Sequence, residues 1–264
     1  MKIKLKQFLS TVAMLLVATF SNPQKASAQA CQPIEFESTK YLLCTVQQGA
    51  VQKGKGELRL FWQHPDGKPY QYFSRLAKAL HTENRVLAFA MNAGMYLNDF
   101  SPMGLYIENG NEQRHANKQR GENLKGPVPN FYKKPNGVFY FDDKVAGILP
   151  TDEFLNEPPK VRFATQSGPM LVIRNQLHPA FIKGSTDRTR RSGVGVCEAG
   201  KIHFAISEDP VNFYDFARLF RDHLQCPNAL FLDGGQGTGI YEPSLGRNDI
   251  SWHGGFGPIV GLVQ

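Results

Sequence analysis

The sequence predicts a single α+β domain built on a mixed, mostly antiparallel sheet with a few helices. Short apolar runs recur along the chain and are separated by turn signals rich in Gly, Pro, Asn and Asp, which is typical of strands joined by hairpins. Few stretches have helical spacing, and strands and helices do not alternate strictly, which argues against a doubly wound parallel sheet. After removal of a predicted leader, the 264-residue chain fits one large domain.

The first half of the domain is expected to be mostly strands. The expected elements are strands over 41–46 and 57–62, a helix over 73–80, a strand over 86–91 and a strand within 101–110. The helix is inferred from Phe73, Leu76 and Leu80, which have helical spacing. A turn signal at 65–67 favours a hairpin there. Residues 111–130 are polar with little periodicity and predict a surface loop.

The second half combines hairpins with one longer helix. The expected elements are strands 137–141, 145–149, 161–165, 170–173, 192–197 and 201–207, a short helix or turn from Thr151, a helix over 213–224, and strands 229–232 and 254–263. Asn212 is a suitable N-cap for the longer helix. Residues 183–191 predict an exposed basic loop.

The N-terminus has the pattern of a secretory signal peptide. Lysines precede an apolar run over 8–20, and small residues follow, so cleavage is expected after Ala28 or Ala30. The apolar run is too short for a membrane span. We therefore divide the chain into a signal peptide (1–30) and one domain (31–264), and expect a periplasmic or secreted protein with no membrane span after cleavage. Gln29 makes a poor lipobox before Cys31, so no lipid anchor is expected.

Charge and cysteine content narrow the possible functions. The leader contains four lysines and no acid, so its removal lowers the formal charge from +7 to +3, which does not indicate a nucleic-acid-binding protein. Export permits disulfides, and four cysteines allow three pairings. Cys31–Cys44 would staple the N-terminal strand and Cys197–Cys226 would tie a strand to a helix end; free thiols are the alternative. No Cys or His spacing resembles a zinc site, and neither a metal nor a cofactor is expected.

One stretch ends a buried strand with a carboxylate. The apolar run 229–232 stops at Asp233, and Gly234 and Gly235 follow. Glycines permit positive φ and let the backbone approach a ligand closely. Asp233 is therefore a candidate catalytic residue; the alternative is a turn residue that hydrogen-bonds its own loop.

Other segments repeat this arrangement. Asn92 with Gly94 and Ser167 with Gly168 also lie at strand ends, and Arg191 comes directly before a glycine-rich strand. Binding sites commonly consist of loops held by a rigid sheet, so these segments predict a common cleft. The alternative for each is turn chemistry, and for Arg191 a surface salt bridge.

The residue types indicate what such a cleft would bind. Arg191 offers a planar fork of donors suited to a phosphate or carboxylate. Asp233 and Glu208 provide two carboxylates, as glycosidic bond cleavage commonly requires. Templates for a serine hydrolase, a P-loop and a dinucleotide site are absent. A sugar joined to a phosphate would engage both kinds of group.

Four motifs in order resemble the phosphodiester glycosidase family. They are Asn92-Ala93-Gly94-Met95-Tyr96, Ser167-Gly168-Pro169, Arg191-Ser192-Gly193-Val194-Gly195-Val196 and Leu232-Asp233-Gly234-Gly235, and the stretch 204–232 resembles bacterial exported members. The resemblance spans roughly residues 85–263. It implies hydrolysis of sugar-1-phosphodiester bonds in envelope or extracellular glycans, with Arg191 holding the phosphate and Asp233 acting at the sugar or leaving group. Asn92, Ser167 and the glycines would shape the cleft, and Glu208 is our own inference as second carboxylate.

Two other functions remain open. A periplasmic protein could bind a phosphorylated glycan without cutting it, in which case the carboxylates would be dispensable. A metal-dependent phosphodiesterase could use Asp233, Asp209 and a histidine. Turnover and its dependence on Asp233 and on chelators distinguish these possibilities.

Overall fold

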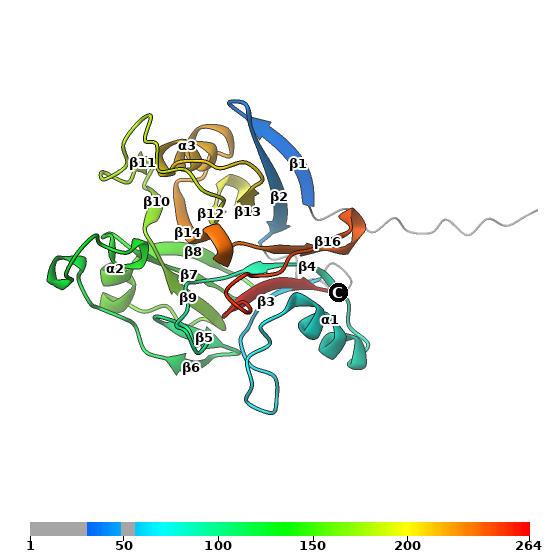
Figure 1. Ribbon diagram of the computed structural model, residues 1–264. Helices are drawn as coiled ribbons and strands as arrows, with labels where there is room; N and C mark the ends of the chain where they lie inside the picture. Colours follow the sequence, from blue (N-terminus) through cyan, green and yellow to red (C-terminus); the bar gives the residue numbers. More distant parts are fainter. Residues whose placement is uncertain (1–30, 49–55) are drawn as a thin grey trace, which may run out of the picture.

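The strands of this protein form three antiparallel sheets in one domain (Figure 1). The computed structural model describes residues 31–48 and 56–264, and the predicted signal peptide lies outside them. Every pairing between named strands is antiparallel. The prediction of an α+β domain with mostly antiparallel strands and few helices is confirmed.

The largest sheet has seven strands. In spatial order they are β1 (Cys31–Phe36), β2 (Thr39–Gln47), β13 (Lys201–Ser207), β12 (Arg191–Val196), β14 (Asn228–Gly234), β10 (Met170–Ile173) and β11 (Gln176–Leu177). Consecutive hairpins explain only part of this order, because β14 lies between β12 and β10 although it comes later in the chain.

Two five-stranded sheets complete the domain. One has the order β16 (Arg247–Asn248), β15 (Ile240–Glu242), β4 (Leu87–Asn92), β17 (Ile259–Val263) and β3 (Glu57–Phe61). The other has the order β6 (Asn111–Arg114), β5 (Tyr106–Glu108), β9 (Phe163–Ser167), β7 (Gly137–Phe141) and β8 (Ala146–Pro150).

The three sheets meet around a common core. Val194 and Leu230 of the large sheet, Phe89 of β4, and Phe139 and Phe163 of the third sheet belong to one buried cluster. Neighbouring positions on these strands, such as Phe231, Ala90 and Val138, point to the other face and belong to separate buried clusters, as the two-residue period of a strand requires. The central core therefore depends on strands that are distant in sequence.

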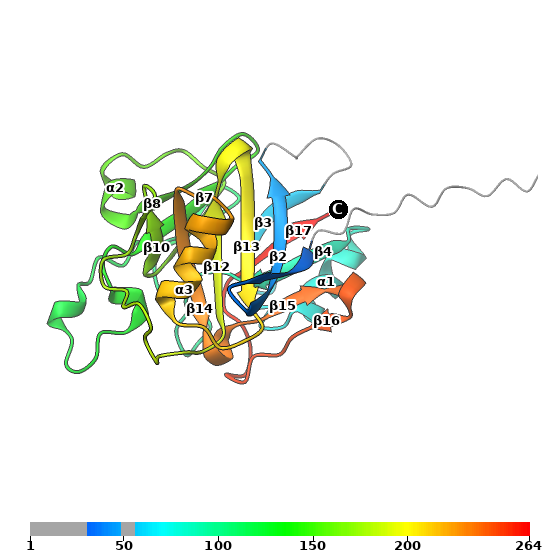
Figure 2. The ribbon, with the colours of Figure 1, turned by 90° about the horizontal axis from the view of Figure 1, so that it is seen from above.

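Short helices cover the outer faces. They are α1 (Phe73–Thr82), α2 (Thr151–Asn156) and α3 (Phe213–Arg218), and the last continues as a π-helical turn over Leu219–His223. Helix α3 packs on the large sheet through Phe216, which meets Phe231 in a second core (Figure 2). Asn212 caps it as predicted, accepting a hydrogen bond from the Asp215 N–H at 2.8 Å. No helix of the described residues is both long and apolar enough to cross a bilayer.

Both predicted disulfides are present. Cys31 pairs with Cys44 across the β1–β2 hairpin, and Cys197 pairs with Cys226 beyond the end of α3. The Cys31 sulfur is thereby used in a disulfide, which leaves no thiol for a lipid.

Two sequence expectations about local structure are wrong. Residues 111–130 are not entirely loop, because Asn111–Arg114 forms β6, an exposed edge strand whose polar side chains hide it from a hydrophobicity pattern. The basic segment 183–191 does not remain exposed to its end, because Arg191 begins β12 and is 1% exposed.

Candidate active site

Strand ends from all three sheets meet at Asp233. Ser192 of β12 lies directly opposite Asp233 of β14. The Ser192 hydroxyl accepts a hydrogen bond from the Asp233 N–H at 3.2 Å and donates one to the Asp233 carbonyl at 3.1 Å. Asn92, at the end of β4, donates through Nδ2 to the same hydroxyl at 2.8 Å. Ser192 therefore connects Asp233 to the sheet that contains β4.

The two other predicted polar strand ends also hold the backbone near Asp233. Asn92 is 1% exposed, and its Oδ1 accepts from the Gly239 N–H at 3.2 Å, beyond the loop that follows Asp233. Ser167, fully buried at the end of β9, donates to the Leu232 carbonyl at 2.8 Å. Asn92 and Ser167 are thus positioning residues. The Asp233 side chain lines a cavity, and neither Asn92 nor Ser167 is among the residues that line it.

The glycines beside these strand ends permit close packing. A Cβ on Gly94 would meet the Gln166 carbonyl, and one on Gly168 would meet Asn136. Gly235 has φ +59°, which turns the chain after Gly234. A Cβ on Gly237 would collide with Asp233 Oδ2, so this glycine leaves room for the carboxylate.

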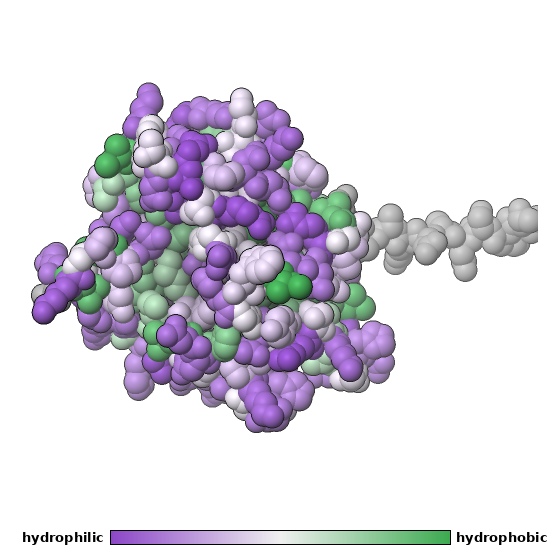
Figure 3. Space-filling view, viewed as in Figure 1, coloured by the Kyte–Doolittle hydropathy of each residue, from purple (hydrophilic) through white to green (hydrophobic). Residues whose placement is uncertain are grey.

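Asp233 lines a cavity of about 570 Å³, within the range of about 300–1,000 Å³ common for small-molecule sites. Aromatic and apolar side chains dominate the walls, and the polar contributions come from few residues; the lining residues are Met95, Tyr96, Leu97, Asn98, Phe100, Met103, Asp233 and His253. The rings of Tyr96 and Phe100 stack with centroids 6.0 Å apart. The face shown in Figure 3 carries apolar side chains, in green, among polar ones.

Burial makes the neutral form of Asp233 more stable than in water. Desolvation raises the pKa of its carboxyl to about 7, and the hydrogen bond from the Gly234 N–H to Oδ1, 2.7 Å long, opposes the rise. Within the described residues, Asp233 forms no salt bridge. Burial also raises the pKa of the nearby Tyr96 phenol, and the charge of Asp233 adds to the rise. A strongly perturbed carboxyl in a cavity is a common property of catalytic sites.

The structure does not bring Glu208 to this cavity. Glu208 follows β13 and pairs with Arg247 at 2.8 Å. It lines a different cavity, of about 530 Å³, together with Ile34, Tyr41 and Leu245. The proposed pairing of Glu208 with Asp233 as two carboxylates of one cleft is therefore not supported by this geometry.

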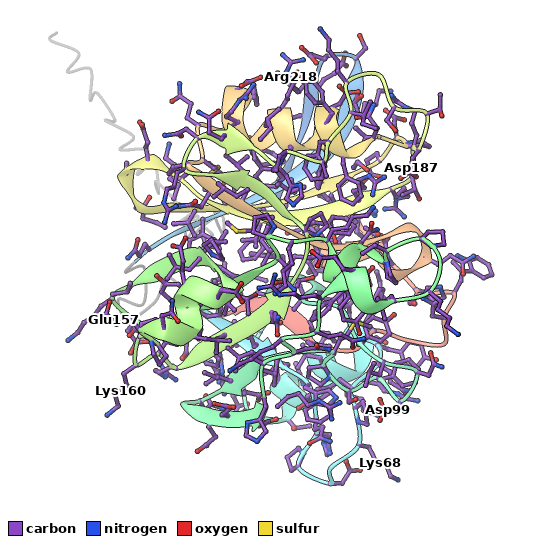
Figure 4. All side chains as sticks on the ribbon, turned by 90° about the vertical axis from the view of Figure 1, so that its left-hand side faces the viewer. Lys68, Asp99, Glu157, Lys160, Asp187 and Arg218 are labelled. Atoms are coloured by element: carbon purple, nitrogen blue, oxygen red, sulfur yellow. A yellow bond between two sulfur atoms is a disulfide. The ribbon has the colours of Figure 1, made fainter. Side chains whose placement is uncertain are left out.

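Arg191 also lies away from the cavity, on the opposite face of β12 from Ser192. Its guanidinium lies 3.6 Å from the centroid of the Phe213 ring, and it donates to the Val211 carbonyl at 2.8 Å and the Asp187 carbonyl at 3.1 Å. Burial lowers its pKa to about 10. Arg191 contacts Asp187, and Asp99 lies between the cavity residues Asn98 and Phe100 in sequence. Figure 4 shows Asp187 above the orange segment that follows β14 and Asp99 below it. Arg191 therefore joins the backbone at Asp187 and Val211 to Phe213 of α3, and its predicted role as phosphate ligand is not supported by this position.

The sequence reasoning missed most residues of this site, among them Tyr96, Ser192 and His253. Tyr96 and Ser192 lie within the quoted motifs, but neither was singled out, because a tyrosine after a glycine and a serine within a strand are common features. His253 lies in a turn far along the sequence, and nothing in its local pattern indicates a site. Among the described residues, no three Asp, Glu, His or Cys side chains gather where they could hold a metal ion.

Comparison with known proteins shows the family to which this chain belongs. The model of the phosphodiester glycosidase family matches residues 85–256, and the chain therefore belongs to that family.

Individual relatives agree with this assignment. The chain is 33% identical over 190 residues to the uncharacterized protein YigE of Escherichia coli, covering 72% of each chain. Its fold is similar to the catalytic domain of zebrafish N-acetylglucosamine-1-phosphodiester alpha-N-acetylglucosaminidase, with TM-score 0.59 and 15% identity over 88% of this chain and 81% of that one. A hypothetical protein from Synechocystis has TM-score 0.56 and 16% identity, covering 88% and 61%. At these identities the two structures establish likeness of fold alone.

Proposed function

We propose that this protein is an exported hydrolase that cleaves the bond between a sugar anomeric carbon and a phosphodiester oxygen in envelope or extracellular glycans. The observation that carries the proposal is Asp233, whose carboxyl has a pKa of about 7 and lines the cavity in a member of the phosphodiester glycosidase family. The zebrafish protein of similar fold is named for action on N-acetylglucosamine-1-phosphodiesters. Two disulfides suit a protein that works outside the cytoplasm.

One carboxylate is sufficient for this reaction. Of the described residues that line the cavity, Asp233 alone carries a carboxylate, whereas most glycosidases use two, one of them to protonate the leaving oxygen. A departing phosphate monoester is stable as an anion and needs no such proton. Ionised Asp233 would take a proton from water while the water oxygen bonds to the anomeric carbon. The carbon–oxygen bond to the phosphate breaks, and its electron pair leaves with the phosphate.

The remaining cavity residues fit the two halves of such a substrate. The stacked rings of Tyr96 and Phe100 offer an apolar wall, and the Asn98 amide offers a donor and an acceptor for sugar hydroxyls. His253 also lines the cavity, and its imidazole can donate a hydrogen bond to a phosphate oxygen. This assigns to His253 the contact that the sequence suggested for Arg191.

Asp233→Asn is expected to lower kcat/KM by about 100-fold or more, because an amide cannot accept the proton.

In the wild-type protein, kcat/KM should rise about tenfold per pH unit below pH 7 and level off above it, since ionised Asp233 is the active form. Sugar release from an N-acetylglucosamine 1-phosphodiester and from a UDP-sugar measures both effects.

Glu208→Gln is the matched control, because it removes a carboxylate from the other cavity. We expect it to retain activity within about twofold of wild type, with circular dichroism confirming that both variants are folded. An equal loss in Glu208→Gln would contradict the single-carboxylate site. Substrate binding retained in Asp233→Asn, with no wild-type turnover on a broad panel, would instead indicate a binding protein for phosphorylated glycans.

A further inference from the structure

A tight turn beside the cavity presents an exposed tryptophan. The Gly254 N–H donates to the Ser251 carbonyl at 3.3 Å, which closes a β-turn with Trp252 and His253 at its centre. His253 lines the cavity that contains Asp233. Trp252, its neighbour at the apex, is 87% exposed, and Ile250, just before the turn, is 67% exposed.

The base of this turn is fixed by several hydrogen bonds. The Tyr96 hydroxyl donates to the Gly255 carbonyl and the Tyr72 hydroxyl to the Gly254 carbonyl, each at 2.9 Å. Ser251 is 2% exposed, and its hydroxyl accepts a hydrogen bond from the His253 N–H at 3.2 Å. Tyr96 itself lines the cavity. The turn is therefore held to the cavity wall, and its apex does not depend on Trp252 for packing.

From this arrangement we infer that Trp252, with Ile250, binds the alcohol that forms the second ester of the phosphate, opposite the sugar, and that this alcohol contains a saturated ring. The inference rests on the proposed function and adds a specificity-determining residue to it. An exposed indole next to a residue that lines the cavity, on a turn whose base is fixed by hydrogen bonds, provides a large apolar face for a bound group. The C–H-rich face of a saturated ring packs flat against such an indole, whereas a short acyclic alcohol covers little of it.

Matched substrates test this inference by kinetics. The methyl and cyclohexyl phosphodiesters of N-acetylglucosamine 1-phosphate differ only in the alcohol that is esterified to the phosphate. For the wild-type protein we expect a lower KM for the cyclohexyl compound. Trp252→Ala should raise the KM of the cyclohexyl compound about tenfold, leave the KM of the methyl compound within twofold, and leave kcat unchanged for both. Equal effects on both compounds, or a loss confined to kcat, would overturn the assignment.

Fluorescence tests the same contact without turnover. The chain has two tryptophans, and Trp62 packs edge-on against Tyr106 with centroids 6.0 Å apart. In a Trp62→Phe, Asp233→Asn protein, Trp252 is the single indole, and titration with the cyclohexyl compound should shift its emission to shorter wavelength. The methyl compound should cause a much smaller shift.

The two measurements separate failure of the inference from failure of the proposed function. An emission shift with no wild-type turnover would preserve the Trp252 contact and reject the hydrolase. Turnover of both compounds with no emission change at millimolar concentration would preserve the hydrolase and reject the contact with Trp252.

Discussion

Asp233 is held where its charged form is unfavourable, and its backbone is fixed by hydrogen bonds to a buried side chain. Ser192 binds both its N–H and its carbonyl, while within residues 31–48 and 56–264 the carboxyl receives a hydrogen bond only from the next residue in the chain. A residue selected for stability alone would have a partner for its charge. The combination of a fixed backbone and an unpaired carboxyl is a known cost of catalytic sites.

The pKa of Asp233 leads to a prediction about stability. The folded-state pKa of about 7 lies above the reference value of 3.8, so the wild-type protein loses stability as the pH rises from about 4 to about 7 and no further above that. Asp233→Asn removes this loss. Relative to wild type, we expect the variant to gain up to about 4 kcal/mol above pH 7 and little at pH 4. The corresponding Tm difference is on the order of 10 °C.

Thermal unfolding of both proteins at a series of pH values provides the measurement. A Tm difference that does not change between pH 4 and pH 8 would show that Asp233 is not desolvated in the folded protein.

The sequence allowed individual site residues to be predicted where a position at the end of a strand marked them as candidates. Asn92, Ser167 and Asp233 each lie at the end of a predicted strand, and the structure brings all three segments together. Arg191 and Glu208 were chosen for their chemical type, which says nothing about the face of the sheet that a side chain occupies. Arg191 is adjacent to Ser192 in sequence, but consecutive strand residues face opposite sides, and the guanidinium meets Phe213 instead of the cavity.

At the scale of elements, the turn Gly235–Gly237 controls the space available to the Asp233 carboxylate. Gly237→Ala would place a methyl group against Asp233 Oδ2 and displace it. A displacement of about 1 Å in a catalytic group can cost about 100-fold in rate. We therefore expect kcat to fall by roughly one to two orders of magnitude while the fold is retained.

Gly246→Ala is a control of similar chemistry. Gly246 has φ +66° and no neighbour within reach of a new Cβ. This substitution should lower the free energy of unfolding by about 1 kcal/mol through backbone strain and leave kcat unchanged. If Gly237→Ala retained full activity, or both variants lost activity equally, the turn would have no particular role in placing the carboxylate.

Element prediction succeeded for strands with apolar patterns and for the N-cap of α3. It missed β6, β11, β15 and β16, which are short, and three of them, β6, β11 and β16, lie at sheet edges. Such strands need only one paired neighbour and little apolar surface, so their sequence carries no clear period. Helix α3 is shorter than expected because the chain changes to a π-helical turn at Leu219, which the apolar spacing of 213–224 does not reveal.

For the whole molecule, the two disulfides should contribute unequally to stability. Cys31–Cys44 closes a sequence separation of 13 residues and Cys197–Cys226 one of 29. In the loop-entropy description, these correspond to roughly 3 and 3.5 kcal/mol respectively. We expect the Cys197→Ser, Cys226→Ser protein to be less stable than the Cys31→Ser, Cys44→Ser protein in urea unfolding. The reverse order would show that native-state effects outweigh the entropy of the unfolded chain.

The division into three sheets could not be predicted from the sequence. Local patterns identify strands, but the order of the large sheet places β14 between β12 and β10 through contacts distant in sequence. The same limitation applies to the cavity, whose lining residues come from 95–103, Asp233 and His253. Their proximity is a property of the folded chain.

The hydrogen bonds of Asn92, Ser167 and Ser192 join one strand end from each sheet at Asp233. No single sheet contains enough of the site to work alone. During refolding, we therefore expect activity to return only with the last sheet to dock, after most secondary structure has formed. The delay between recovery of the circular dichroism signal and recovery of activity would then measure how long the docking of the last sheet takes.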